Sequence, residues 1–401
     1  ARILAEAASA KGFKSGHIVS YPIESLQKSG LPLKPLETIS PYSEGITVDR
    51  PEPIGDYKVL DGRLGYAISG QITDLLHKLP GKTLIMDLYI VPPGQMVINA
   101  IDSFRGLRHQ PNVITIGEAV GSDITNVVTN ALAAGQTGAA QVVLSNFLQH
   151  DLPVAVSQFT KDMIVESGQR VDAELGTHFA DMLRERVEIS FPAIDTSAYT
   201  SIEKDPERVA SVLANRQLEK DEYVMFLSRI APAKGVDDLI EAYKTSELYG
   251  HKKLIICGNG PRKEKILEVA ATDPNIRVLD DVSDSEKGVL MHGAFAYCLP
   301  SKPKPEFIET FGIAVAEKLL AGGLGPAITT RTGGIPEATG GHCLEHEAGN
   351  IDELRECLDK AYFMTEDERL ELSQRAREFA MSFDRFAILE NLITRSLAVT
   401  S

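Results

Sequence analysis

The chain has 401 residues, of which 43% are hydrophobic and 24% are charged. These proportions are typical of soluble globular proteins and exclude a disordered or fibrous chain. The formal net charge of −15 argues against nucleic acid and anionic membranes as partners, because both are bound by Lys and Arg side chains that neutralise phosphates.

The length predicts two domains, because a single hydrophobic core stops growing at about 250–300 residues. The junction is expected over residues 192–206, where a Pro-Ala-Ile-Asp segment leads into a polar, charged stretch. We therefore predict a first domain over residues 1–195 and a second over residues 206–382.

The first domain shows short apolar runs that alternate with amphipathic stretches. Residues 30–55, which are rich in Pro and Gly, are expected to form a long surface excursion. His150 is interpreted as a solvated surface side chain. The predicted strands are residues 57–60, 83–86, 113–116, 154–156 and 187–191. The predicted helices are residues 65–79, 95–104, 124–132 and 161–167.

The second domain shows the same alternation more regularly, and this rhythm predicts a parallel sheet with helices on both faces, as in Rossmann-like folds. Further on, Thr365 and Glu368 have the spacing of a capping box at the start of a helix. The predicted strands are residues 223–227, 254–257, 276–279, 294–299 and 327–330. The predicted helices are residues 236–245, 262–271, 285–291 and 314–321.

The cysteines indicate a reducing compartment. Cys257, Cys298, Cys343 and Cys357 have no C-x-x-C spacing, and the first two lie in apolar runs typical of buried strands. The first residues lack the charged-then-apolar layout of a secretory signal, and no apolar run approaches the length of about 18 residues that a membrane span needs. We therefore expect a cytoplasmic protein without a membrane span.

Residues suited to ligand binding follow four successive predicted strands of the second domain. Ligands of doubly wound folds bind where parallel strands end, at the carboxyl edge of the sheet. Two cations on one loop suit a diphosphate, and glycines let the backbone approach a ligand closely. In chain order these residues are Arg229 and Lys234, Gly258 and Gly260, Glu309 and Glu317, and Gly333 and Gly334.

Two carboxylates stand out among them. Glu309 is expected in a loop after a strand, whereas Glu317 lies early in a helix that begins near Gly312. Both could face one ligand, and the amide groups at the start of that helix could bind phosphate oxygens. The alternative for any such pair in isolation is two solvated surface charges.

The order and spacing of these motifs resemble the retaining glycosyltransferases of the GT-B fold, in particular glycosyltransferase family 4. The resemblance covers about residues 186–340. It is carried by Phe226-Leu-Ser-Arg-Ile-Ala-Pro-Ala-Lys-Gly235, Ile255-Ile-Cys-Gly-Asn-Gly-Pro261, Pro300-Ser301, the pair Glu309 and Glu317, and Thr332-Gly-Gly-Ile-Pro-Glu337.

The resemblance implies a role for each of these residues toward a nucleoside-diphosphate sugar. Arg229 and Lys234 would hold the diphosphate, Glu317 the ribose hydroxyls, and Glu309 the hydroxyls of the transferred sugar. The backbone of Phe311, Gly312 and Ile313 would cap the phosphates, and Gly258 and Gly260 would line the donor site. We therefore expect Glu309, Arg229 and Lys234 to act in catalysis and the others to bind the donor.

The first domain matches this family less well. The segment Gly12-Phe-Lys-Ser-Gly16-His17 stands where the family keeps a glycine-rich loop after its first strand, and Gly16 is the candidate donor contact. The segment Gly117-Glu118-Ala-Val-Gly121 is similar to the Gly-His-Ser-Leu-Gly segment of sucrose-phosphate-synthase-like members, with Glu118 in place of the histidine. This difference indicates a different sugar or acceptor, or an ordinary loop carboxylate.

We therefore predict an α/β protein of the GT-B type, with two Rossmann-like domains facing each other across a cleft and a C-terminal helix, residues 383–401, packing on the first domain. The predicted activity is retaining transfer of a hexose from a UDP-, GDP- or ADP-sugar to a hydroxyl of a small sugar, sugar phosphate, glycerate-like solute or oligosaccharide. No cofactor is expected, and the absence of an Asp-x-Asp pair favours metal-independent transfer. A homo-oligomer is compatible with the sequence. The alternatives are a nucleotide-sugar epimerase of the same fold and a non-catalytic nucleotide-sugar sensor or scaffold subunit.

Overall fold

Both halves of the chain form α/β units in the computed structural model, which describes residues 1–29, 39–54, 63–107, 111–305 and 307–400. One unit consists of residues 1–193 and 385–401, and the other of residues 194–384. The N-terminal unit therefore contains the last segment of the chain.

The N-terminal unit is built on a four-stranded parallel sheet with the strand order β3-β4-β5-β6. These strands are β3 (Thr83–Leu88), β4 (Val113–Ala119), β5 (Leu152–Ala155) and β6 (Glu188–Ile189). A separate parallel pair is formed by β1 (Gly16–Val19) and β2 (Ile46–Asp49). The helices are α1 (Arg2–Ala10), α2 (Ile23–Lys28), α3 (Arg63–Lys78), α4 (Pro93–Gly106), α5 (Ser122–Ala133), α6 (Thr137–Leu148), α7 (Gln158–Leu175) and α8 (Phe179–Arg186).

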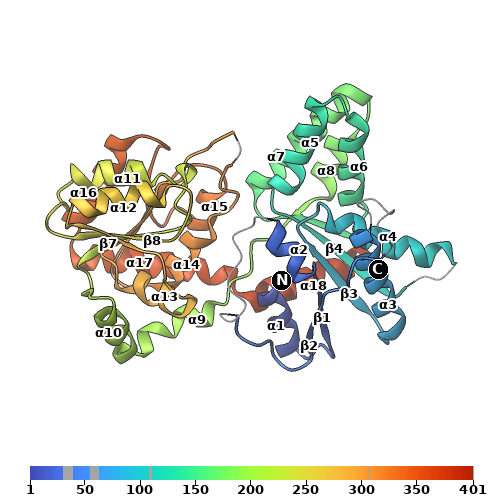
Figure 1. The fold of residues 1–401 in the computed structure, drawn as a ribbon, viewed down its shortest axis with the longest axis horizontal. Coiled ribbons are helices and arrows are strands. Elements are labelled where there is room, and N and C mark those ends of the chain that lie inside the picture. The colour runs from blue at the N-terminus through green and yellow to red at the C-terminus, as the bar shows by residue number, and fades with distance from the viewer. Residues whose placement is uncertain (30–38, 55–62, 108–110, 306, 401) are drawn as a thin grey trace. The chain divides into compact units, whose positions relative to one another are not determined.

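The final helix, α18 (Arg385–Thr400), completes the core of the N-terminal unit. In Figure 1 this red helix lies beside the blue α1 and against the sheet. Leu392 is fully buried in a cluster with Ile116 and Val154, and Leu389 packs against Leu4 on α1. The apolar side chains of α18 thus cover strands that lie more than 200 residues earlier in the sequence.

The C-terminal unit is built on a six-stranded parallel sheet with the order β12-β11-β10-β7-β8-β9. Its central strands are buried on both faces, as near-continuous apolar runs predict. The strands are β7 (Tyr223–Leu227), β8 (Lys253–Cys257), β9 (Ile276–Leu279), β10 (Ala296–Leu299), β11 (Ala327–Thr330) and β12 (Leu344–His346). The helices are α9 (Thr196–Thr200), α10 (Pro206–Asn215), α11 (Val236–Lys244), α12 (Lys263–Thr272), α13 (Asp284–Gly293), α14 (Ile313–Ala321), α15 (Ile335–Thr339), α16 (Ile351–Phe363) and α17 (Glu366–Ala380).

The expectations for the second half are confirmed closely. All five predicted strands and all four predicted helices are present, with ends that differ by at most two residues. The capping box is present as well: Thr365 accepts from the amide of Glu368, and the Glu368 side chain accepts from the amide of Thr365.

Two expectations for the first half are wrong. The segment from Gly12 to His17 does not follow a strand, because residues 2–10 form helix α1 and Gly16 opens β1. The helix forms because Leu4 and Ala7 lie one turn apart and bury a common face. The predicted excursion over residues 30–55 contains strand β2, whereas the predicted strand at residues 57–60 lies outside the described residues.

His150 is also not a solvated side chain. It is fully buried, its Nε2 lies 2.7 Å from Asp87 Oδ2, and its Nδ1 lies 3.1 Å from the carbonyl oxygen of Phe147. A Cβ on Gly117 would come within 2.8 Å of the imidazole ring, so only glycine fits at that position of β4. Burial is the largest single influence and acts to lower the pKa of His150, but the hydrogen bond to Asp87, the negative charge of Asp87 and backbone hydrogen bonds together outweigh it and raise that pKa.

Candidate functional site

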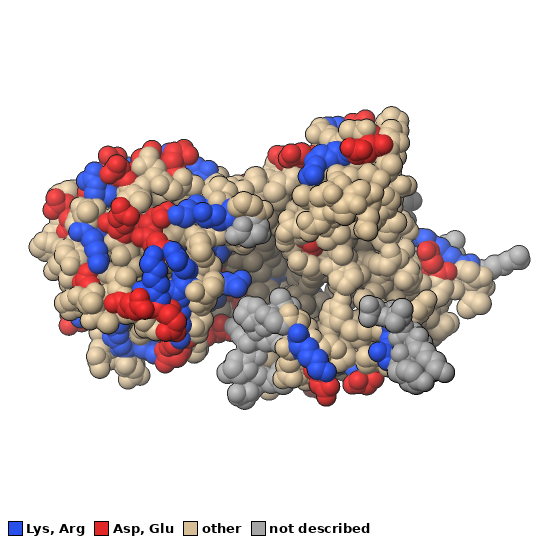
Figure 2. Space-filling view, turned by 45° about the horizontal axis from the view of Figure 1, so that its top comes forward, with Lys and Arg blue, Asp and Glu red and all other residues tan. Residues whose placement is uncertain are grey.

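The sequence-predicted residues of the C-terminal unit gather at the carboxyl edge of its sheet. They follow β7, β8, β10 and β11, which are adjacent in the order β11-β10-β7-β8. The carboxyl ends of parallel strands meet at one edge, so residues from four distant parts of the sequence lie in one region. Figure 2 shows Lys, Arg, Asp and Glu side chains interleaved over the surface of this unit.

Glycines allow the loops at this edge to touch. A Cβ on Gly235 would lie 2.0 Å from the carbonyl oxygen of Pro300, and one on Gly258 would lie 2.0 Å from that of Ser228. Gly260 has a φ of +157° and would place a Cβ 2.4 Å from the carbonyl oxygen of Ile230. Contact between loops therefore explains why glycine is needed at positions 258 and 260.

A close contact at a glycine also joins the loop after β11 to the loop that carries Glu309. A Cβ on Gly333 would lie 1.9 Å from the carbonyl oxygen of Glu309, which also accepts from the amide of Gly334 at 2.9 Å. The Gly333-Gly334 turn thus fixes the backbone at Glu309. A larger residue at either position would displace that carboxylate.

Lys234 and Glu309 come together across two loops. They form an ion pair, and both side chains are largely buried, at 14% and 16% exposure. Lys234 Nζ also lies 4.5 Å above the centroid of the Phe307 ring, which adds a cation–π contact. Arg229, on the same loop as Lys234, is exposed, and no ion pair holds its side chain within the described part of the chain.

Glu317 occupies a second, similar cluster. Its Oε1 accepts from Lys287 Nζ at 2.7 Å, and the two side chains are 15% and 21% exposed. The Tyr199 phenol lies against this carboxylate; burial first, and then the charge of Glu317, raise the pKa of Tyr199. Lys287 Nζ is 5.8 Å from the centroid of the Tyr199 ring.

A buried tyrosine lies within electrostatic reach of both carboxylates. Tyr297, on β10, is fully buried and donates from its hydroxyl to the carbonyl oxygen of Leu227 at 3.0 Å. Burial raises its pKa, and the negative charges of Glu317 and Glu309 raise it further. The cluster of Lys234 with Glu309 and the cluster of Lys287 with Glu317 therefore flank the end of β10.

Helix α14 begins at this edge. Gly312 is its N-cap with a φ of +99°, a left-handed conformation that favours glycine. Phe311 is buried and packs edge-on against Phe383 with 5.1 Å between ring centroids, whereas Ile313 is 48% exposed. The first amides of an α-helix have no acceptor within the helix, so this end can bind an anion.

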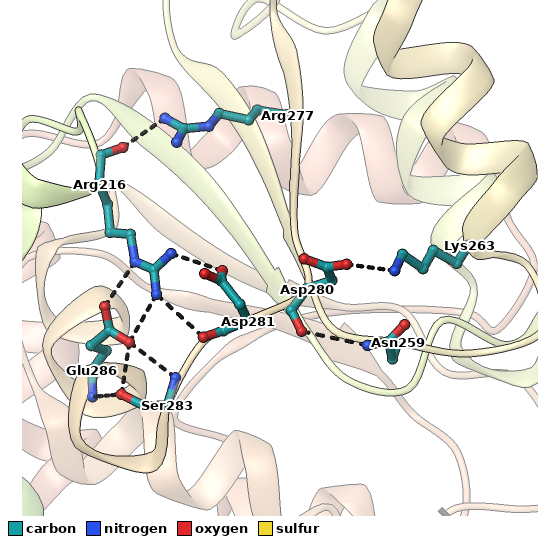
Figure 3. Close-up of polar contacts among 8 residues, drawn as sticks. All are labelled: Arg216, Asn259, Lys263, Arg277, Asp280, Asp281, Ser283 and Glu286. Atoms are coloured by element: carbon teal, nitrogen blue, oxygen red, sulfur yellow. Dashed lines mark hydrogen bonds and ion pairs between the residues drawn. The ribbon is translucent and has the colours of Figure 1, made fainter.

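The loop after β9 borders the site and is held by charged side chains (Figure 3). Arg216 donates from Nε to Glu286 Oε1 and from Nη1 to Asp281 Oδ1, each at 2.7 Å. Ser283 and Glu286 form a capping box at the start of α13. Asn259, from the loop after β8, donates to the carbonyl oxygen of Asp280 at 3.4 Å.

The Glu286 network should make stability depend on acidity. Hydrogen bonding from Arg216 lowers the pKa of Glu286 from 4.5 to about 2, so its stabilisation is present above pH 4.5 and is lost as the pH falls toward 2. We expect Glu286→Gln to destabilise the protein at pH 7 by about 1–3 kcal/mol and by much less near pH 3. Differential scanning calorimetry at both pH values measures the difference. An equal loss at both would contradict the role of charge.

In the N-terminal unit, Glu118 lies at the carboxyl end of β4 and is half-buried. Burial is the main cause that raises the pKa of Glu118 to about 7, and the charge of the nearby Asp123 contributes in the same direction. The Asp123 carboxylate accepts from the amides of Ile90 at 2.8 Å and Gly121 at 2.9 Å, which ties the loops after β3 and β4 together. Glu118 thus stands on a rigid edge and can exchange a proton near neutral pH.

Gly16 lies in β1, where its amide donates to the carbonyl oxygen of Gly45 at 2.9 Å. Sequence reasoning missed Lys287, Tyr199 and Phe307 as neighbours of the two carboxylates, because each comes from an element with no motif of its own. In the described ranges, no group of three or more His, Cys, Asp or Glu side chains is arranged to hold a metal ion. None of the helices described there has the length and apolar character that crossing a bilayer requires.

Comparison with known proteins relates the C-terminal half to a family. Residues 213–379 match the family described as Glycosyl transferases group 1. The 2-deoxystreptamine N-acetyl-D-glucosaminyltransferase of Niallia circulans is 30% identical over 115 residues, or 28% of each chain. The N-acetyl-alpha-D-glucosaminyl L-malate synthase of Bacillus anthracis is 27% identical over 171 residues, 40% of this chain and 41% of that protein. The chain thus matches less than half the length of these curated relatives.

The fold extends the similarity over the whole chain. The crystal structure of Anabaena HepE in complex with UDP and glucose superposes with a TM-score of 0.65 at 15% identity, covering 99% of this chain and 95% of that one. The prediction of a GT-B fold is thereby confirmed.

Proposed function

Given a Glycosyl transferases group 1 domain over residues 213–379 within a GT-B fold, we propose that this protein is a retaining glycosyltransferase. It transfers a hexose from a nucleoside-diphosphate sugar to a hydroxyl group of a small acceptor. The observation that carries this proposal is the pair of lysine–carboxylate clusters, Lys234 with Glu309 and Lys287 with Glu317, at one sheet edge.

The clusters suit the parts of a nucleotide sugar. Arg229 and Lys234 neutralise the diphosphate together with the amide groups at the start of α14. The carboxylate of Glu317 accepts two hydrogen bonds from the ribose hydroxyls, and the hydrogen bond from Lys287 orients it. Glu309, fixed by the Gly333-Gly334 turn, accepts from hydroxyls of the hexose.

The reaction needs no nucleophile from the protein. The bond between the anomeric carbon and the β-phosphate oxygen breaks, and the departing phosphate takes the proton of the acceptor hydroxyl. The acceptor oxygen then bonds to the anomeric carbon on the face that the phosphate left. Arg229 and Lys234 stabilise the negative charge that grows on the diphosphate, which in this proposal replaces a metal ion.

The donor that we propose to test first is a UDP-sugar. HepE, which shares the fold, was crystallised with UDP, and the names of both curated relatives contain an N-acetylglucosaminyl group. UDP-glucose and UDP-N-acetylglucosamine are therefore the first donors, with GDP- and ADP-sugars as comparisons. The acceptor is a sugar, a sugar phosphate, a glycerate-like solute or an oligosaccharide end.

A thermal-shift screen with UDP, GDP and ADP, followed by turnover assays with the preferred sugar nucleotide, tests this function. Release of nucleoside diphosphate that depends on an acceptor supports a transferase. Conversion of the sugar nucleotide without any acceptor identifies an epimerase instead. Binding without turnover across a broad acceptor panel identifies a sensor or scaffold subunit.

Glu317→Ala should weaken nucleotide binding by roughly 1–3 kcal/mol, because it removes the acceptor of the ribose hydrogen bonds. Calorimetric titration with the preferred nucleoside diphosphate measures this loss. Glu222→Ala is the matched control, since Glu222 forms an ion pair with Lys252 of the same length, 2.7 Å, but precedes β7 at the opposite sheet edge. Unchanged affinity in Glu317→Ala, or an equal loss in both variants, would remove Glu317 from the binding site.

A further inference from the structure

A second concave site lies at the amino edge of the C-terminal sheet, away from the residues of the proposed donor site. Its volume is about 540 Å³, within the size range of small-molecule sites. Lys220 and Leu218 line it just before β7, His292 just before β10, and Leu324 just before β11. Strands β7, β10 and β11 are adjacent and parallel, so these residues mark the edge opposite to Arg229 and Glu309.

The lining is mostly apolar. Val209 and Leu213 come from α10, Leu324 from the turn after α14, and Leu370 from α17. Leu370 is 41% exposed and contributes apolar surface to the pocket. The charged side chains of Glu203, Glu219 and Lys220 also line the pocket, and Glu203 forms an ion pair with Arg377.

One polar side chain, that of His292, lies in the apolar wall of the pocket. His292 is 6% exposed, and its Nδ1 donates to the carbonyl oxygen of Ala321 at 2.8 Å. Burial lowers the pKa of His292, so the ring is neutral at pH 7 and Nε2 carries a lone pair. Within the described part of the chain, Nε2 has no hydrogen-bond partner, and solvent can still reach this atom.

The backbone holds this histidine in place. A Cβ on Gly323 would lie 2.0 Å from the carbonyl oxygen of His292, so only glycine lets the turn after α14 pack against it. One on Gly293 would lie 2.9 Å from the Tyr223 hydroxyl, which donates to the carbonyl oxygen of Leu290 at 2.6 Å. The acceptor nitrogen therefore has a fixed position in the wall of the pocket.

From these contacts we infer that this pocket is a second ligand site, for a small molecule with an apolar body and one hydroxyl or N–H group that donates to His292 Nε2. The apolar side chains of α10 and α17 bind the body, and the histidine selects the donor group. The site goes beyond the proposed transferase function and does not depend on it.

The test uses two probes of the same shape, 2-phenylethanol and n-propylbenzene, in which a terminal hydroxyl group and a methyl group take the same place. Saturation-transfer NMR should detect 2-phenylethanol, and His292→Phe should shift the ratio of the two affinities at least about threefold toward the hydrocarbon, the change that loss of one net hydrogen bond gives. Saturating UDP should not displace the probe, because the two sites lie at opposite sheet edges.

A second variant keeps the test decisive if His292→Phe does not fold. Ala210 lines the pocket from an exposed position on α10, so Ala210→Trp fills the pocket with little effect on the core. We expect this variant to lose binding of the probe and to retain nucleotide binding. A ratio of the two affinities that His292→Phe leaves unchanged, or unchanged binding by Ala210→Trp, would overturn the site. Neither outcome bears on nucleotide turnover, so the transferase proposal is judged separately.

Discussion

Lys234→Ala should reduce turnover about 100- to 1000-fold, the usual loss when a fixed group that stabilises developing charge is removed. The loss should appear mainly in kcat, because the charge on the leaving diphosphate grows in the transition state. Lys234 is suited to this role because Glu309 and the ring of Phe307 already hold its ammonium group in place. Steady-state kinetics with the preferred sugar nucleotide measures the effect.

The chain offers a close control for this variant. Lys252 also combines an ion pair, with Glu222 at 2.7 Å, and a ring contact, 5.1 Å above Phe295, but it precedes β8 at the opposite sheet edge. Lys252→Ala should therefore leave turnover unchanged while costing a similar amount of stability. If Lys234→Ala retains activity, or if both variants lose it equally, Lys234 has no part in the reaction.

Lys318→Met should stabilise the protein at neutral pH, although it removes a hydrogen bond. Lys318 is 2% exposed, its Nζ donates to the carbonyl oxygen of Gly322 at 2.6 Å, and burial lowers its pKa from 10.5 to about 7. Between these values the unfolded chain holds a proton that the folded chain has released, so stability rises as the pH increases from 7 to 10.5.

Lys318→Met should raise the free energy of unfolding by about 2–4 kcal/mol at pH 7. This gain is the free energy that corresponds to the pKa shift of Lys318, minus the contribution of the hydrogen bond that the variant loses. It should shrink steadily toward pH 10. Because the chain contains no Trp, hydrogen exchange of the buried strands β7 and β10 is a suitable measure. Lys318→Arg is the control: it cannot lose its charge and should destabilise at every pH. A gain that does not vary with pH would refute the explanation.

The sequence predicted the C-terminal unit well because its signals are local. Apolar β-branched runs such as the one at β8 lie between amphipathic stretches, and Gly258 follows β8 directly as Pro300 follows β10. Parallel strands then bring Lys234 and Glu309 to one edge without any further information. Strand order alone thus accounts for most of the candidate site.

The features that were missed depend on contacts between distant segments. Burial of His150 follows from Asp87 and Gly117, neither of which is close to it in sequence. Lys287 meets Glu317 because α13 and α14 pack together, and no spacing rule encodes that contact. The sequence predicts ligand approach at Gly258 and Gly260, and it does not show that protein backbone also lies close to both glycines.

The chain crosses between the units twice, at residues 193–194 and 384–385, and hydrogen bonds link the two crossing segments. The amide of Ile194 donates to the carbonyl oxygen of Phe383 at 2.9 Å, and Thr196 Oγ1 donates to Asp384 Oδ2 at 2.6 Å. A protease that nicks only the first crossing segment therefore cannot release a fragment, since α18 still anchors the C-terminal piece in the core around Leu392. The two units can be separated only by severing both.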